Sequence, residues 1–242
     1  MTVTEMHSAA APILPEHHIP AELLLDYASG SLGEAWSLVV ACHLTLCPHC
    51  RAELAAIEAL GGRLLEEMPP QPMQPAGFAA IAARLGPQEP APDMQEKTRQ
   101  QKVRPQPEPA AGGGLPAPLR AYLSGGVDRI PWRWSGAGLH AFALPVQKAR
   151  GGMASLLRIA PGTGMPRHSH AGEEMTLVLS GGFTDDAGAF RRGDVEIADG
   201  STEHRPVAMA GEPCICLAVT DAPLRFSGSF GWILNQWSKL SS

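Results

Sequence analysis

The sequence predicts two structured parts, an all-α N-terminal part and an all-β C-terminal part, joined by a linker rich in Pro and Gly. Apolar residues recur every three or four positions in the first third of the chain, which is typical of helices. Many of the 26 Gly and 23 Pro residues gather in the middle. After Leu115 the pattern changes to short β-forming runs punctuated by turn residues. We expect domains at 1–86 and 115–242, with the linker at 87–114.

Composition excludes several classes of function. The formal net charge is only −5 and no polybasic run is present, so we expect neither direct nucleic-acid binding nor a membrane-binding surface. No apolar run approaches the roughly 18 residues of a membrane span. The first residues do not resemble a signal peptide, which predicts a cytoplasmic protein. Five cysteines, an odd number, favour free thiols or metal-bound thiolates over disulfides.

The first two helices follow from caps and spacing. Pro20 suits the first turn of a helix whose apolar stripe runs until Gly30. Ser31 and Glu34 have the S-x-x-E spacing of a capping box, which predicts that a second helix starts there. Its apolar residues are expected to share one face, namely Trp36, Val39, Val40, His43 and Leu44.

Pro48 predicts the next boundary, because proline is tolerated in the first turn of a helix but not in its interior. We expect the second helix to end near Leu46 and the third to start at Pro48, burying a stripe of Leu54, Ile57, Leu60 and Leu64. Further on, helical spacing recurs at Phe78, Ile81, Ala82 and Leu85. That helix either binds a partner or packs on the other three.

His43, Cys47 and Cys50 bring three metal donors within one or two helical turns. They supply three of the four ligands of a tetrahedral zinc site, and His17 or His18 could supply the fourth. Cys47 is expected at a helix N-terminus, where the dipole favours a thiolate. The alternatives are two ordinary buried thiols or a redox-active cysteine pair.

A second donor set lies among the predicted strands. His168 and His170 point to one face of a strand, Glu174 starts the next strand, and His204 follows a later turn. Three imidazoles and one carboxylate are typical of a divalent transition metal site. The alternative is a β domain that has lost its metal. Five runs read as strands: 153–159, 175–179, 195–198, 206–209 and 214–219.

Cys214 and Cys216 share one face of the last of these strands if the register is as predicted. We interpret them as small apolar side chains of the core. The alternative is a pair of modifiable thiols near the metal.

The second donor set matches the first cupin motif through Gly162, His168, His170, Glu174 and Gly181. Gly193 and His204 fit the second cupin motif, which is otherwise incomplete. H-x3-C-x2-C with an upstream histidine, best matched by His18, resembles the zinc-binding anti-sigma domain. In this order the two parts resemble the ChrR family of anti-sigma factors.

This resemblance implies an all-α zinc-binding helical bundle followed by an all-β cupin barrel. It implies zinc ligands at His18, His43, Cys47 and Cys50, and a second zinc, or another divalent metal, at His168, His170, Glu174 and His204. It further implies an anti-sigma factor that inhibits an extracytoplasmic-function sigma factor and releases it under oxidative stress, such as singlet oxygen.

The cupin would then sense an oxidant or a small molecule, and the chain would not be an enzyme. One alternative is a metal-dependent cupin dioxygenase or hydrolase. Another is a thiol sensor in which oxidation of Cys47 and Cys50 expels zinc.

Overall fold

The computed structural model describes residues 14–72, 77–85, 114–136, 138–147, 152–222 and 224–226. The chain forms two compact units, one of residues 1–58 with 115–242 and one of residues 59–114. The helical segment 14–58 therefore belongs to the same unit as the β strands. The predicted linker lies outside the described residues except for Gly114, and the predicted domain boundaries stay predictions.

Helix α1 (Ala21–Ala28) begins directly after Pro20, as predicted. The capping-box prediction for α2 (Glu34–Leu46) is wrong, because Gly33 occupies the N-cap and no side chain caps the helix. Ser31 instead donates its hydroxyl to the Asp26 carbonyl oxygen, 3.0 Å away. This leaves the Glu34 carboxylate free for other contacts. It accepts hydrogen bonds of 2.7 Å from the Tyr122 hydroxyl and the Gln147 N–H.

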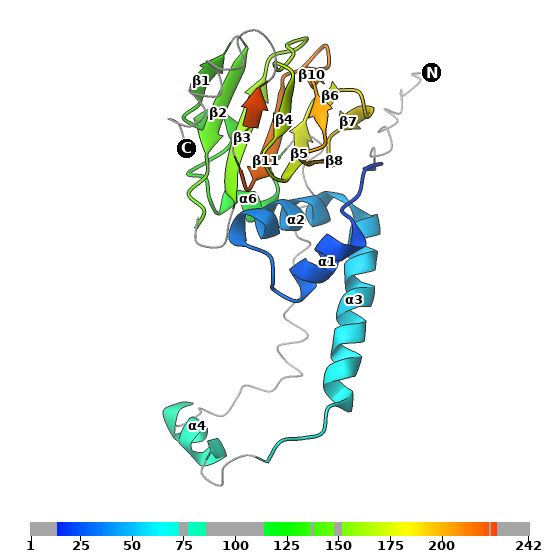
Figure 1. Ribbon diagram of the computed structural model, residues 1–242. Coiled ribbons are helices and arrows are strands. Elements are labelled where there is room, and N and C mark those ends of the chain that lie inside the picture. The colour runs from blue at the N-terminus through cyan, green and yellow to red at the C-terminus, as the bar shows by residue number, and fades with distance from the viewer. Residues whose placement is uncertain are drawn as a thin grey trace, which may run out of the picture. The chain divides into compact units, whose positions relative to one another are not determined.

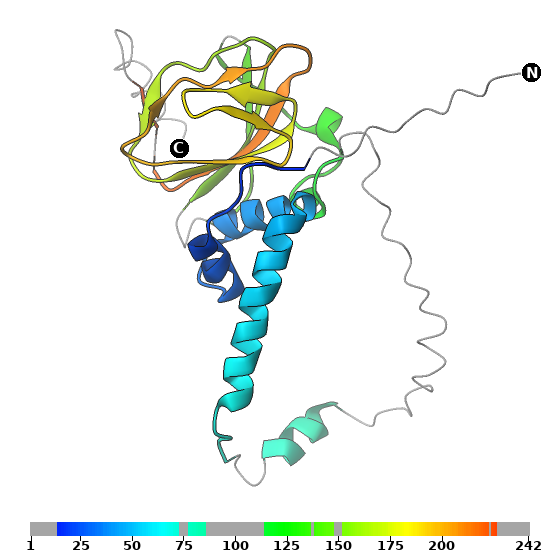
Figure 2. The ribbon, with the colours of Figure 1, turned by 90° about the vertical axis from the view of Figure 1, so that its right-hand side faces the viewer.

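Helix α2 is buried more widely than predicted: the five predicted residues are all buried, and Ala35, Leu38 and Cys42 are buried as well. It contacts α1 and the short helix α6 (Ala117–Arg120) as well as strands of the large sheet. Figures 1 and 2 show it directly against the β strands, with α1 beside it. Its buried residues are Ala35, Trp36, Leu38, Val39, Val40, Cys42, His43 and Leu44.

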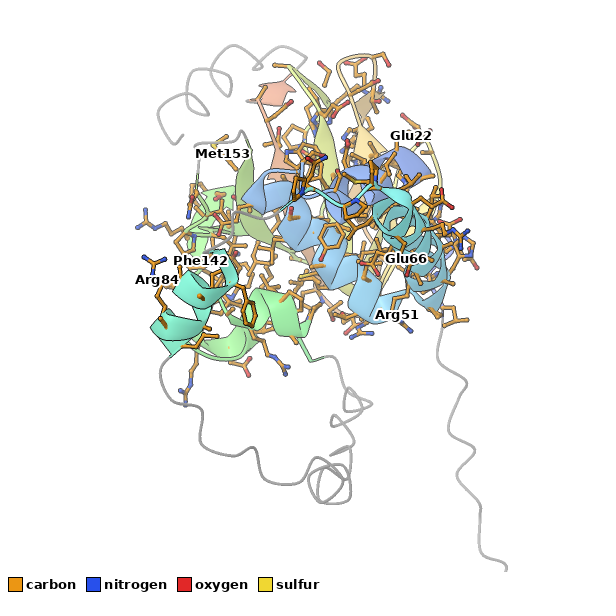
Figure 3. The ribbon with its side chains drawn as sticks, turned by 90° about the horizontal axis from the view of Figure 1, so that it is seen from below. Glu22, Arg51, Glu66, Arg84, Phe142 and Met153 are labelled. Carbon is orange, nitrogen blue, oxygen red and sulfur yellow. The ribbon has the colours of Figure 1, made fainter. Side chains whose placement is uncertain are left out.

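Helix α3 (Pro48–Glu67) starts at Pro48, as predicted. The Arg51 guanidinium, labelled in Figure 3, donates to the Leu44 carbonyl oxygen at 2.6 Å and joins α3 to the end of α2. Leu54 and Ile57 pack on the core. The second half of the predicted stripe is exposed, with Leu60 at 62% and Leu64 at 59%. Helix α4 (Gly77–Leu85) likewise buries none of its residues.

The β strands form three antiparallel sheets, of order β1-β2-β3-β11-β5-β8, β10-β6-β7 and β12-β4-β9. The predicted fold class is confirmed, although the strands among the described residues do not close into one hydrogen-bonded barrel. A 3-10 turn (Val127–Arg129) precedes them. The strands are β1 (Arg133–Gly136), β2 (Leu139–Ala143), β3 (Met153–Ile159), β4 (His168–His170), β5 (Glu174–Ser180), β6 (Gly182–Thr184), β7 (Ala189–Arg191), β8 (Val195–Ala198), β9 (Glu203–His204), β10 (Val207–Ala208), β11 (Cys214–Thr220) and β12 (Leu224–Phe226).

The six-stranded sheet is covered on both faces. Met175 and Leu217 belong to the same hydrophobic cluster as α2, whereas Val178 and Cys216 belong to a second cluster with Phe183 of the small sheet. Burial of both faces explains why β5 and β11 are nearly continuous apolar runs without clear alternation. The helical part is therefore attached to the outer face of the large sheet, and the sheet β10-β6-β7 covers its inner face.

Candidate metal centres

Four donors from three places in the chain meet at the junction of α2 and α3. His18, His43, Cys47 and Cys50 each offer one ligand atom, and these atoms all lie within 4.8 Å of one another. His43 comes from the last turn of α2, while Cys47 and Cys50 lie on either side of the α3 start. Of the two upstream histidines, His18 is the one in this group.

The donor chemistry fits zinc. His43 Nε2 lies 3.2 Å from Cys50 Sγ, and His18 Nδ1 lies 3.3 Å from Cys47 Sγ. A tetrahedron with usual zinc–sulfur and zinc–nitrogen bonds has N···S edges of about 3.5 Å, close to these separations. Two sulfurs and two imidazoles are also a common set of ligands for structural zinc. Only a small adjustment would be needed to place an ion at the centre.

Burial shapes the protonation of this cluster. It lowers the pKa of His43 to about 4, so the imidazole is neutral and can offer a lone pair. It also raises the pKa of Cys50 to about 12, and the neighbouring Cys47 thiol adds to the effect. Without a cation, the protein thus favours the thiol at Cys50. A divalent ion would reverse that preference, because it stabilises the bound thiolate directly.

The orientation of His43 is set from outside the helices. Its Nδ1–H donates to the carbonyl oxygen of Gly193 at 2.8 Å, in the turn between β7 and β8. A carbonyl oxygen can only accept, so the proton lies on Nδ1 and the Nε2 lone pair faces the sulfurs. Such outer contacts commonly fix the tautomer of a metal-binding histidine.

Three imidazoles converge in the interior of the β part. His168 and His170 lie on β4, and His204 lies on β9 directly opposite His168. The Nε2 atom of His204 is 3.1 Å from the Nε2 atoms of both other rings. All three residues are buried. Three nitrogens converging on one point can hold a divalent cation in place of their mutual contacts.

Glu174 lies near this cluster but outside the group formed by the three histidines. Its Oε2 is 3.5 Å from His170 Nδ1, and its Oε1 accepts a hydrogen bond from the Thr176 hydroxyl at 3.1 Å. Burial raises the pKa of this carboxyl. As placed, Glu174 contacts the far side of an imidazole whose Nε2 belongs to the cluster.

Two carboxylates that the sequence interpretation missed contact His204. Its Nδ1 lies 2.9 Å from Glu196 Oε1 and 3.0 Å from Asp185 Oδ2. Burial alone would lower the pKa of His204, but these carboxylates raise it to about 9. Burial raises the pKa of Glu196 to about 7. No sequence pattern pointed to Glu196, because in β8 it is buried while Ile197 is 40% exposed, the reverse of what the polarity of the two side chains predicts.

Cys214 and Cys216 face the same interior. Their sulfur atoms are 3.4 Å apart and both side chains are buried. Cys216 belongs to the same hydrophobic cluster as Val178 and Phe183. The predicted register is therefore confirmed, with both thiols inside.

The chain thus combines a helical part that carries four metal donors with a β part that carries three converging histidines, the arrangement expected of a cupin-type protein with two candidate metal sites. Residues 123–223 match the family model described as the ChrR cupin-like domain. Over 213 residues, covering 87% of this chain and 92% of the relative, the sequence is 44% identical to anti-sigma-E factor ChrR of Cereibacter sphaeroides.

A protein of known structure is similar to this chain as well. The crystal structure of Rhodobacter sphaeroides SigE in complex with the anti-sigma ChrR contains a chain similar to this one, with a TM-score of 0.69 and 40% identity. The match covers 85% of this chain and 99% of that one. The chain belongs to the ChrR family of anti-sigma factors. No helix among the described residues is long and apolar enough to cross a membrane.

Proposed function

We propose that the chain binds and inhibits an extracytoplasmic-function sigma factor in the cytoplasm, and that its β part controls release under oxidative stress. The supporting observation is the family relationship along nearly the whole chain, together with the related ChrR chain crystallised with SigE. The net charge of −5 favours an effect on transcription through a protein partner and not through DNA.

Zinc at the first site is part of this proposal, with His18, His43, Cys47 and Cys50 as ligands. The converging donors and the N···S separations of 3.2 and 3.3 Å support it. Bound zinc would join the segment before α1 to the α2–α3 hairpin. In a small helical domain such an ion contributes directly to the free energy of folding.

Zinc or another divalent metal at the second site is proposed to bind His168, His170, His204 and Glu174. Three converging Nε2 atoms support the histidines. Glu174 is included because it completes the cupin motif; its carboxylate, 3.5 Å from His170 Nδ1, would have to turn from the far side of that ring to reach the same ion. An oxidant or small molecule acting at this metal would be the signal for release.

The exposed apolar residues of α3 and α4 are proposed to contact the sigma factor. Phe78 is 72% exposed, Ile81 58% and Leu85 67%, although all three are large and apolar. On α3, Leu60, Leu64 and Leu65 are exposed as well, and so is Met68 directly after the helix. Amphipathic helices with unburied apolar faces are common recognition elements for grooves on partner proteins.

Gel filtration of the purified chain with extracytoplasmic-function sigma factors from the same genome tests this function. We expect one of them to form a stoichiometric complex. An Ile81→Ser variant should weaken that complex, whereas Ala83→Ser, on the opposite side of α4, should leave it unchanged. Absence of a complex with every such sigma factor would contradict the proposal.

The alternative of a metal-dependent dioxygenase or hydrolase receives no support from the family, whose relative bears the name of a regulator. Oxidation of Cys47 and Cys50 with loss of zinc stays an alternative route for the signal. The two routes differ in which site responds first to the oxidant.

A further inference from the structure

The turn between β7 and β8 approaches the N-terminal donor hairpin more closely than any side chain would allow. Gly193 has φ +95°, and a Cβ atom there would lie 2.6 Å from Pro15 Cγ and 3.6 Å from Leu46 Cβ. Glycine is therefore required for two reasons: the positive φ of the backbone, and the short distance between this turn and Pro15. The turn is pressed against both the segment before α1 and the end of α2.

Asp194, the next residue, binds the backbone of the segment before α1. Its Oδ1 accepts hydrogen bonds from the N–H groups of Glu16 at 2.7 Å and His17 at 3.0 Å. Its Oδ2 accepts from Arg191 N–H at 2.7 Å, which fixes the carboxylate on its own turn. Asp194 is only 3% exposed, so these charge-assisted bonds are shielded from water.

This segment carries one metal donor, and the turn also orients a second. His18 directly follows His17, whose carbonyl oxygen accepts a hydrogen bond from Val195 N–H at 3.3 Å. The Gly193 carbonyl accepts from His43 Nδ1 at 2.8 Å. Both histidines of the N-terminal site are thus positioned by the β part. The two cysteines are placed by the helical hairpin itself.

The same turn leads straight into the second site. Glu196, two residues after Asp194, contacts His204 Nδ1 at 2.9 Å. One cleft of about 680 Å³ is lined by His18 at one site and by Glu196 and His204 at the other. A movement of β8 at His204 would therefore act on the turn that holds the N-terminal histidines.

We propose that Gly193 and Asp194 are positioning residues of the N-terminal metal site, and that through them the β part determines how tightly this site holds its metal. This inference rests on the proposed metal binding by His18, His43, Cys47 and Cys50. It adds that the β part fixes two of the four donors, all of which lie in residues 18–50. Loss of the turn would leave two cysteines in place and two histidines without fixed orientation.

Cobalt binding to the full-length chain tests this inference, because only the N-terminal donor set contains sulfur and only it gives a thiolate-to-cobalt charge-transfer band. Zinc displacement of that band measures the zinc affinity of this site alone. Asp194→Ala should lower the zinc affinity of this site about 10- to 100-fold, the usual loss when an outer contact of a metal ligand is removed. Total metal content should show the histidine cluster still loaded.

Asp199→Ala is the matched control. Asp199 also accepts backbone N–H hydrogen bonds, from Ser201 and Thr202, but makes them within its own turn of the β part. It should leave the charge-transfer band and its zinc affinity at the wild-type values. If Asp194→Ala does not fold, Asp194→Asn decides: it keeps one acceptor oxygen but no charge, so its zinc affinity at the thiolate site should fall below the wild-type value while the histidine cluster stays loaded.

An Asp194 variant that folds with wild-type zinc affinity at the thiolate site would overturn the inference. Loss of metal from both sites to the same extent would also overturn it, because that result indicates general destabilisation. Absence of the charge-transfer band in the wild-type chain would instead refute the proposed N-terminal metal site.

Discussion

Replacing Gly193 by alanine should destabilise the fold more than the same change at Gly211. Both glycines have positive φ, +95° and +105°, but a Cβ at Gly211 meets nothing within 4 Å. The backbone strain of alanine in this region costs about 1–3 kcal/mol and applies to both variants. The pair therefore separates the strain of the turn from its contact with the N-terminal segment.

The additional cost at Gly193 follows from the contact with Pro15. At 2.6 Å from Pro15 Cγ the new methyl group forces the segment away from the turn. Retreat weakens the bonds that Glu16 and His17 donate to the Asp194 carboxylate. A hydrogen bond to a charged group contributes about 1.5–3 kcal/mol, so partial loss of two gives an extra destabilisation of about 1–3 kcal/mol.

Thermal unfolding of the metal-saturated full-length chain measures the difference. At about 2–4 °C for each kcal/mol in a domain of this size, Gly193→Ala should melt about 2–12 °C below Gly211→Ala. It should also bind zinc more weakly at the thiolate site. Equal melting temperatures for the two variants would refute the reasoning, because they would show that close contact between the turn and the N-terminal segment does not contribute to stability.

Three further outcomes are expected. Cys47→Ser should remove one equivalent of bound metal and unfold α1–α3, which circular dichroism would record as a loss of helical signal. Cys42→Ser, which removes a buried thiol outside the donor group, should keep the metal. In the chelator-treated, metal-free chain, burial lowers the pKa of His43 from 6.5 to about 4, so the unfolded state takes up the proton first as the pH falls. Stability is therefore full above pH 6.5 and falls by roughly 3 kcal/mol towards pH 4, which chemical denaturation at several pH values measures. His168→Ala should leave the sigma complex intact on gel filtration and abolish induction of a sigma-dependent reporter; a variant that loses sigma binding would contradict this division of roles.

Local chemistry predicted much of the helical part. Pro48 marks the start of α3 to the residue, because a proline in a helix interior is excluded by its own covalent structure. The spacing of His43, Cys47 and Cys50 likewise reflects helical geometry, and the structure brings these donors together. A helix start and the spacing of donors along a helix depend only on residues a few positions apart, so a local sequence pattern is enough to predict them.

Long-range packing was not predictable in the same way. The S-x-x-E pattern at Ser31 predicted a cap, but the Glu34 carboxylate accepts hydrogen bonds from Tyr122 and Gln147, about a hundred residues away. Leu60 looked like a core residue by its period and is exposed, because the core reaches only the first turns of α3. Strands of two or three residues, such as β9 with His204, are too short to show a period.

The first donor set is supported by two parts of the fold, and this has a thermodynamic consequence. Cys47 and Cys50 are held by helices, while His18 and His43 depend on Asp194 and Gly193 of the β part. If docking of the β part raises zinc affinity at this site tenfold, zinc must strengthen that docking by the same factor, about 1.4 kcal/mol. Hydrogen exchange should therefore slow at the amides of Glu16 and His17 when zinc is added, and only when Asp194 is present. Equal slowing in wild type and Asp194→Ala would show that zinc acts within the helices alone.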